Sequence, residues 1–154
     1  MNRRPTAVKA LGEIALRVDD LDRMQKFYEE VIGLEVFKRF PKAVFFRIAD
    51  GHKGHPQALV LFDRKEKPTG PKIHKSTPQG VSQERSTLDH LAFEIDLKEY
   101  ESEHNRLKQL GLSVETKSFE WAGWRSLYIS DPEGNTVEFV CYDPSVKKSE
   151  QDAK

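Results

Sequence analysis

Residues 11–18 and 88–95, LGEIALRV and LDHLAFEI, carry one pattern twice in a single chain. In both stretches apolar side chains recur at every second position, a period that predicts a β-strand. An aspartate follows each stretch at the same distance, Asp19 in the first and Asp96 in the second. Asp19 and its neighbour Asp20 can cap a first helix, and Asp96 can cap a second. The pattern therefore predicts two strand–helix units that begin 77 residues apart, at residues 11 and 88.

The residues after each strand extend this match. Apolar residues at helical spacing come first, and Gly33 and Gly111 then stand where a glycine commonly ends a helix. Strand-like runs follow at 42–50 and 57–63 in the first half, and at 112–116, 124–130 and 135–143 in the second. Each half is expected to form one strand, one helix and three strands, with residues 58–62 matching 135–139. We interpret the chain as a duplication; chance likeness of two ordinary strand–helix units is the alternative.

The duplication predicts how the chain is organised. Residues 64–87 are rich in Lys, Pro, Gly, Ser and Gln, and the residues from 144 onward are polar. The first of these segments is interpreted as a solvated linker, with a flap over the substrate as the alternative. The expected parts are a tail at 1–10, a module at 11–63, the linker or flap at 64–87, a module at 88–143 and a disordered tail at 144–154, the two modules forming one domain.

Composition excludes several classes of function. The chain has 154 residues, with 25 Lys and Arg against 25 Asp and Glu. A net charge of zero gives no electrostatic reason to expect a nucleic acid or a membrane surface as partner. One cysteine, Cys141, rules out an internal disulfide framework. Charged residues interrupt the N-terminal segment too early for a signal peptide, so a cytoplasmic protein is expected.

The repeat also predicts a metal site. Glu13 and His90 occupy the third position of the two first strands, and Glu138 lies in the last strand at a position matched by Leu61. In each first strand this residue lies on the face away from the apolar side chains. One imidazole and two carboxylates suit Fe, Mn, Ni or Mg more than a closed zinc site. The alternatives are a structural histidine, an exposed Glu138 and a salt bridge from Glu13 to Arg17 or Lys9.

Other side chains are candidates for a substrate pocket. Arg17 and Glu94 are equivalent positions of the repeat and are interpreted either as an ion pair across a cavity or as substrate contacts. Phe46, Trp121 and Trp124 are expected to form an aromatic wall. Core packing or a dimer interface explains such aromatic residues equally well.

Three motifs resemble the vicinal oxygen chelate superfamily, which includes glyoxalase I, extradiol dioxygenases and bleomycin resistance proteins. They are IALRVDDLDRMQKFYEEVIGL at 14–34, LDHLAFEI at 88–95 and YISDPEGNTVEF at 128–139. The resemblance covers about residues 10–143 and implies an α+β fold, with two tandem βαβββ modules forming a cupped mixed sheet around one divalent metal. It also implies ligands at the positions of Glu13, His90 and Glu138. Two positions depart from the family pattern, because Glu13 replaces the usual His or Gln and Leu61 cannot ligate.

The third motif also resembles the extradiol dioxygenase pattern Tyr-x-x-Asp-Pro-x-Gly-x-x-x-Glu. This implies that Tyr128 hydrogen-bonds a substrate oxygen beside Glu138. The histidine that those enzymes place before the tyrosine is absent, and Glu120 is the candidate acid or base in its place. The resemblance implies a homodimeric, metal-dependent enzyme for a small oxygenated substrate, most like a ring-cleaving dioxygenase. A metal-free small-molecule binding or resistance protein and a glyoxalase I-like lyase are the alternatives.

Overall fold

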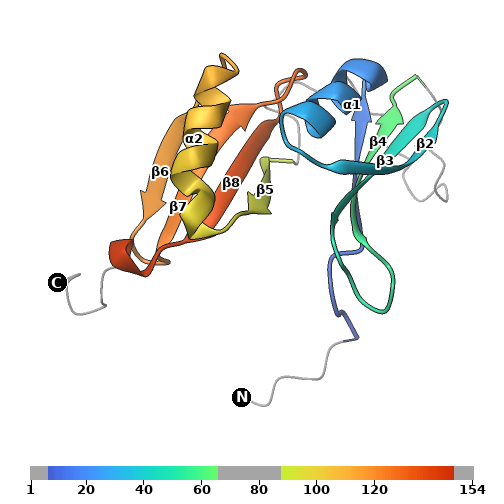
Figure 1. Cartoon of the computed structure of the whole chain (residues 1–154). Coiled ribbons are helices and arrows are strands. Elements are labelled where there is room, and N and C mark those ends of the chain that lie inside the picture. The colour runs from blue at the N-terminus through green and yellow to red at the C-terminus, as the bar shows by residue number, and fades with distance from the viewer. Residues whose placement is uncertain (1–6, 66–87, 148–154) are drawn as a thin grey trace. The chain divides into compact units, whose positions relative to one another are not determined.

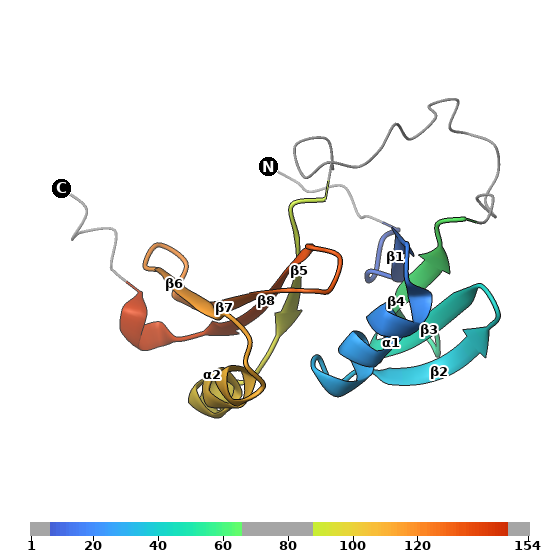
Figure 2. The ribbon, with the colours of Figure 1, turned by 90° about the horizontal axis from the view of Figure 1, so that it is seen from above.

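The chain folds into two compact units, Met1–Ile73 and His74–Lys154, each with one α-helix against one four-stranded sheet (Figures 1 and 2). The computed structural model describes residues 7–65 and 88–147. Almost all of the expected linker or flap at 64–87, the start of the first tail and the end of the last lie outside the described residues.

The two units contain the same elements in the same order, which confirms the tandem βαβββ modules of an α+β fold. The first consists of β1 (Glu13–Val18), α1 (Leu21–Glu30), β2 (Glu35–Phe40), β3 (Ala43–Ala49) and β4 (Gln57–Asp63). The second consists of β5 (His90–Glu94), η2 (Leu97–Glu99), α2 (Tyr100–Gln109), β6 (Glu115–Phe119), β7 (Trp124–Ser130), β8 (Thr136–Tyr142) and η3 (Pro144–Val146). Sequence analysis had not delimited β2, and η3 is a short 3₁₀ helix inside the segment expected to be a tail. No helix in the described part of the chain is long and apolar enough to cross a membrane.

The sheets have matching strand orders, β1-β4-β3-β2 and β5-β8-β7-β6. In each sheet the first strand runs parallel to the last strand of its unit, and the other neighbours are antiparallel. Both sheets are therefore mixed, as expected. This topology places the first strand beside the fourth, so residues far apart in sequence become neighbours on one face.

Local sequence explains where the first helix begins and ends. The Asp20 carboxylate accepts a hydrogen bond from the backbone N–H of Arg23 at 3.0 Å, which caps α1. Gly33 follows α1 with a φ of +85°, a conformation that glycine adopts without strain. Asp96 behaves differently, because it precedes η2 and makes no side-chain cap hydrogen bond. The two helices thus start by different means.

Each unit buries one face of its sheet beneath its helix and leaves the other face open. In the first unit Met24 and Tyr28 of α1 are fully buried, as are Phe46 and Leu61 of the sheet. In the second unit Leu107 of α2 is buried, together with sheet residues Leu127, Val137 and Cys141. The burial of Cys141 on the helix side agrees with its alternation in sequence. Side chains free to meet a ligand are those of the opposite, open faces.

Strand pairing corrects one step of the repeat alignment. Ala92 of β5 pairs with Glu138, whereas its equivalent in the first unit, Ala15, pairs with Val60. Val60, and not Leu61, is therefore the counterpart of Glu138, and Leu61 lies on the helix side. A shift of one residue moves a side chain to the other face of a sheet. The run 58–62 is apolar at every position, so its sequence alone did not determine the register.

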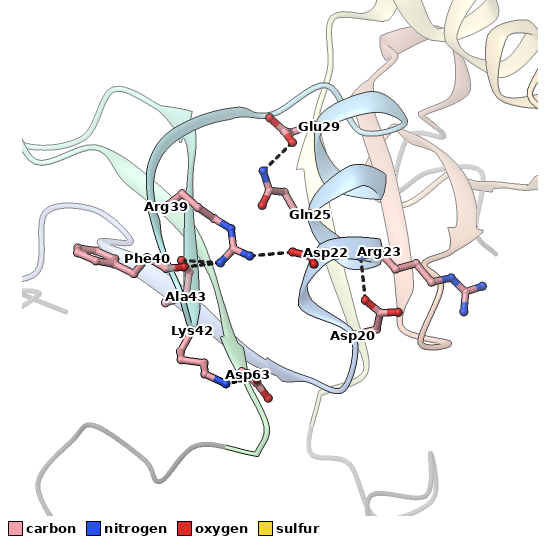
Figure 3. A network of polar contacts seen from close by, with 10 residues as sticks. All are labelled: Asp20, Asp22, Arg23, Gln25, Glu29, Arg39, Phe40, Lys42, Ala43 and Asp63. Carbon is pink, nitrogen blue, oxygen red and sulfur yellow. Dashed lines mark hydrogen bonds and ion pairs between the residues drawn. The ribbon is translucent and has the colours of Figure 1, made fainter.

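A polar network joins the helix and the hairpin of the first unit (Figure 3). The Arg39 guanidinium of β2 lies 2.8 Å from the Asp22 carboxylate in the first turn of α1. The same guanidinium donates to the backbone oxygens of Phe40 and Ala43 around the β2–β3 turn. This contact ties the edge strand to the helix, and both side chains remain partly exposed.

Candidate metal centre

The open face of the second unit gathers polar side chains from three adjacent strands. Along β5 the exposed residues are His90, Ala92 and Glu94, which alternate with apolar residues that face α2. Ala92 pairs with Glu138 of β8, and Glu138 pairs in turn with Tyr128 of β7. Because paired residues of a sheet point to the same side, one continuous row carries the carboxylate and the phenol.

The centre of this face is a contact between His90 and Glu138. The Nε2 atom of His90 lies 3.0 Å from Oε2 of Glu138. The Glu138 side chain is only 7% exposed, whereas that of His90 is 38% exposed. A carboxylate so deeply buried requires a compensating partner. The imidazole is thus placed between the buried carboxylate and solvent.

Asp89 holds the other side of the imidazole. Its Oδ1 atom lies 2.6 Å from Nδ1 of His90. A neutral imidazole that donates its Nδ1 proton to Asp89 presents a bare Nε2 lone pair to Glu138. Two lone pairs at 3.0 Å repel unless a cation lies between them, either a proton or a metal ion. Carboxylate–histidine–metal arrangements use the same kind of support to fix the ring and its tautomer.

Tyr128 supports the carboxylate from the other side. Its hydroxyl donates a hydrogen bond to Oε1 of Glu138 at 3.0 Å. Burial, with a further contribution from Glu138, raises the pKa of the Tyr128 phenol above its ordinary value. The phenol therefore stays protonated at neutral pH and acts as a hydrogen-bond donor. Each oxygen of Glu138 has a defined partner, which fixes the orientation of the carboxylate.

A cavity of about 340 Å³ extends along the open face from this pair of side chains. That volume lies at the lower end of the range for small-molecule sites. The residues that line it are His90, Ala92, Glu94, Trp124, Glu138, Val140, Cys141 and Tyr142. The small side chain of Ala92 leaves room above the middle of the sheet.

Glu13 belongs to the first unit. It is exposed on the open face of β1, which it shares with the exposed Ala15 and the half-buried Arg17, as the alternation predicted. Within the described residues of either unit, no three His, Cys, Asp or Glu side chains form a group that could hold a metal ion. The second unit thus provides two of the expected ligands, His90 and Glu138, and the contribution of Glu13 remains a prediction. The Arg17 guanidinium donates to the backbone oxygen of Arg64 at 2.8 Å.

Two of the three residues expected to form an aromatic wall, Phe46 and Trp121, do not line the cavity. Phe46 is fully buried on the helix side, with its ring 5.9 Å from that of Tyr28, so it is a core residue. Phe45 occupies the open face of that strand, because it pairs with Val60. Trp121 is 74% exposed and lies outside the lining of the cavity. Its ring packs 5.5 Å from that of Trp124, which does line the cavity.

Glu120 and Tyr128, the two expected catalytic residues, lie at opposite ends of the β6–β7 hairpin. Glu120 follows Phe119, which pairs with Trp124 at one end of β7, whereas Tyr128 lies four residues further along that strand. Four residues of strand span about 13 Å. Glu115 is the cross-strand neighbour of Tyr128. Glu120 is therefore not positioned for proton transfer beside the Tyr128 hydroxyl.

Sequence reasoning missed two residues of this site, Asp89 and Tyr142. Asp89 directly precedes the predicted ligand His90, and an acidic residue beside a candidate histidine is a signal that deserved weight. Tyr142 follows Glu138 and Val140 at alternate positions of β8, so the period of the strand predicts the same face.

These features define a class of protein in which paired βαβββ modules present a histidine and a carboxylate above an open sheet. The chain belongs to the glyoxalase/bleomycin resistance protein/dioxygenase superfamily, whose family description matches residues 10–139. This confirms the resemblance drawn from the three sequence motifs.

Several known proteins share this fold with the chain. A lactoylglutathione lyase from Agrobacterium tumefaciens is 30% identical, with a TM-score of 0.63, and the match covers 90% of this chain and 96% of that one. The metallothiol transferase FosB from Lysinibacillus sphaericus (strain C3-41) is 25% identical over 133 residues, 86% of this chain and 82% of the relative. The fosfomycin resistance protein FosX from Listeria monocytogenes is 19% identical, and the match, with a TM-score of 0.59, covers 92% of this chain and 99% of that one. At this level of identity it shows a likeness of fold alone.

Proposed function

We propose that this protein is a divalent-metal-dependent enzyme whose substrate is a small molecule that binds the metal through neighbouring oxygen atoms. The observation that carries the proposal is the His90–Glu138 contact at 3.0 Å. With Nδ1 of His90 turned toward Asp89, the Nε2 lone pair and the carboxylate face each other and require a cation between them. A divalent metal ion meets that requirement and places both residues in its coordination shell.

Three side chains hold the metal in this proposal: His90, Glu138 and Glu13. The set offers one nitrogen and two carboxylates, which favours Fe, Mn, Ni or Mg, and leaves positions open for substrate oxygens. The bound metal would supply Lewis-acid polarisation of those oxygens, or dioxygen chemistry if it is iron. Asp89 orients the imidazole and raises its strength as a ligand.

Tyr128 is the proposed substrate-orienting residue. Its protonated hydroxyl lies beside Glu138 and can turn its proton toward a substrate oxygen bound next to that carboxylate. This arrangement supports ring cleavage of a catechol as the specific activity to test first. The proton-transfer role once expected for Glu120 is left out, because Glu120 lies at the other end of the hairpin.

A glyoxalase I-like lyase or a thiol transferase is the second candidate activity. The 30% identity to a lactoylglutathione lyase and the 25% identity to a metallothiol transferase favour it. The strand register places Val60, which has no ligating atom, at the position equivalent to Glu138. A metal-free binding protein is the remaining alternative, in which a proton takes the place of the metal between His90 and Glu138. A homodimer also remains a prediction, and Glu13 is then supplied by the same chain or by a second copy.

Metal analysis of protein purified without chelator tests the proposal. We expect about one divalent ion per chain in the wild type. Loss of a ligand removes a bond to the metal, so Glu138→Ala is expected to lower metal affinity by more than about 100-fold, beyond what loss of a supporting residue causes. Glu13→Ala should lower affinity as well, if Glu13 completes the set. Glu99→Gln, which changes an exposed carboxylate outside the cavity, should retain full occupancy.

Two assays on the loaded wild-type protein then separate the activities. Oxygen consumption with catechol reports ring cleavage, and lactoylglutathione formation from methylglyoxal and glutathione reports glyoxalase activity. Wild-type protein that binds no divalent ion, together with unchanged ligand binding in Glu138→Ala, would refute the enzyme proposal. Lactoylglutathione formation without oxygen consumption would replace the first activity with the second.

A further inference from the structure

The cavity has a second end, away from His90 and Glu138, built from different chemistry. Glu94, Trp124 and Tyr142 line it there, and Val140 lies between them on the sheet. Trp124 is 43% exposed and Tyr142 is 52% exposed, so both rings offer surface to a ligand. None of these residues has a role in holding the proposed metal.

Strand register fixes how these side chains lie. Trp124 and Tyr142 are directly paired on the antiparallel strands β7 and β8, with side chains on the open face. Glu94 pairs with Val140, so it is the diagonal neighbour of Tyr142 on that face. Paired and diagonal neighbours are within reach when the side chains are long. A carboxylate and two aromatic rings therefore border the same end of the cavity.

Among the described residues of its own unit, Glu94 has no ion-pair partner. The ion pairs found among the described residues of that unit involve other acidic groups, and Glu94 takes part in none of them. Its carboxylate is exposed at the cavity wall. Aromatic faces attract cations through their ring quadrupoles, and an adjacent carboxylate adds a Coulombic attraction. Together these groups favour a cation and disfavour an anion.

We propose that Glu94, Trp124 and Tyr142 form a subsite for a cationic amine, either protonated or quaternary, carried by the substrate. This inference rests on the proposed function, since it describes the other end of the same substrate. Glu94 lies two residues beyond Ala92, which is level with Glu138, and four residues beyond His90. These intervals span about 7 Å and about 13 Å along a strand. The substrate class is an oxygen chelator with an amine at roughly that separation.

Three probes that share one chelating end test the charge preference. Dopamine carries an ammonium group, 4-ethylcatechol is its neutral analogue and 3,4-dihydroxyphenylacetate is anionic. Dissociation constants for the metal-loaded protein are measured by titration calorimetry. We expect dopamine to bind about three- to tenfold more tightly than 4-ethylcatechol, and the anion to bind most weakly.

Variants assign this preference to the subsite. Glu94→Gln keeps the shape of the side chain and removes its charge, so it should abolish the advantage of dopamine and leave 4-ethylcatechol unchanged. Trp124→Leu should reduce the same advantage. Glu99→Gln removes one negative charge outside the cavity and should leave all three constants unchanged. Equal effects of Glu94→Gln on dopamine and 4-ethylcatechol would overturn the proposal, as expected if Glu94 instead pairs with Arg17.

A metal-free experiment separates this inference from the proposed function. Choline and its neutral isostere 3,3-dimethylbutan-1-ol are titrated into chelator-treated protein while tryptophan fluorescence is recorded. Choline should change the fluorescence saturably in the wild type and not in Trp124→Leu, and the neutral isostere should have a smaller effect. If choline binds but no catechol does, the proposed metal function fails and the cation subsite stands. If catechols bind without any preference for charge, the cation subsite fails alone.

Discussion

The open faces of the two units share one scaffold and differ in chemistry. In the second unit Tyr128 pairs with Glu138, and in the first unit the equivalent pair is Phe45 and Val60. The phenol hydroxyl and the carboxylate are thus present together in one copy and absent together in the other. A buried carboxylate is costly without a donor, and a buried hydroxyl needs an acceptor. Because both groups differ between the two units, the phenol of Tyr128 and the carboxylate of Glu138 depend on each other in the second unit.

The first unit uses its open face for aromatic packing instead. The ring of Phe45 lies 6.0 Å from that of Phe37, 5.9 Å from Phe40 and 6.2 Å from Phe62. Phe37 and Phe40 are each 47% exposed. Apart from Glu13 and Arg17 of β1, the open face of the first unit is thus largely aromatic, whereas that of the second unit carries the paired phenol and carboxylate.

The largest expected effect tests which face of the first unit is its core. Phe46→Ala removes a fully buried ring beneath α1 and should lower the free energy of unfolding by about 3–5 kcal/mol. Phe45→Ala removes a partly exposed ring from the open face, so its effect should be well below half of that. Urea denaturation of both variants measures the difference. Equal losses would contradict the assignment of the two faces.

Sequence alone predicted the polar face of the second unit because polar and apolar residues alternate there. In LDHLAFEI that alternation placed His90 on the side away from the helix, and the last motif placed Glu138 beside Tyr128. The tandem βαβββ order could also be predicted from sequence, because the first strand of each unit is followed by a helix and a glycine.

The first unit was harder to predict, since its strands β3 and β4 are largely apolar on both faces. Residues 58–62 contain no polar position, so the alignment slipped by one residue and selected Leu61 in place of Val60. Phe45 and Phe46 are adjacent and chemically alike, and burial alone separates them. The expected role of Glu120 was not supported for a different reason. Glu120 lies in the turn after β6, at the end of the β6–β7 hairpin away from Tyr128.

A second test concerns the residue before each first strand, which is Asp89 in the second unit and Gly12 in the first. Asp89→Ala removes the partner of His90 Nδ1 and should weaken metal binding by about 10- to 100-fold, with the fold unchanged. Asp89→Asn should recover part of this loss, because its amide oxygen still accepts the Nδ1 proton. Metal titration calorimetry measures both. An unchanged affinity in Asp89→Ala would show that the contact does not orient the imidazole.

The smallest expected effect compares how each unit ties its helix to its sheet. In the second unit the Arg125 guanidinium lies 3.9 Å from the centre of the Tyr100 ring and 2.8 Å from Glu101. In the first unit the Arg39–Asp22 ion pair includes a carboxylate that is 88% exposed. Stacking adds attraction that salt screens weakly, whereas an exposed ion pair contributes little. Arg125→Met should lower the free energy of unfolding by about 1–2 kcal/mol, and Asp22→Asn by less than about 0.5 kcal/mol.

Salt dependence of urea denaturation distinguishes the two contacts. Raising the salt concentration to about 1 M shortens the screening length to about 3 Å, so the effect of Asp22→Asn should vanish. Most of the effect of Arg125→Met should persist, because salt only weakly screens the short-range contact of the guanidinium with the Tyr100 ring and does not affect the packing of the arginine stem. Loss of both effects at high salt would show that the stack adds nothing to the ion pair, and that in each unit the helix is tied to its own sheet by a weak ion pair alone.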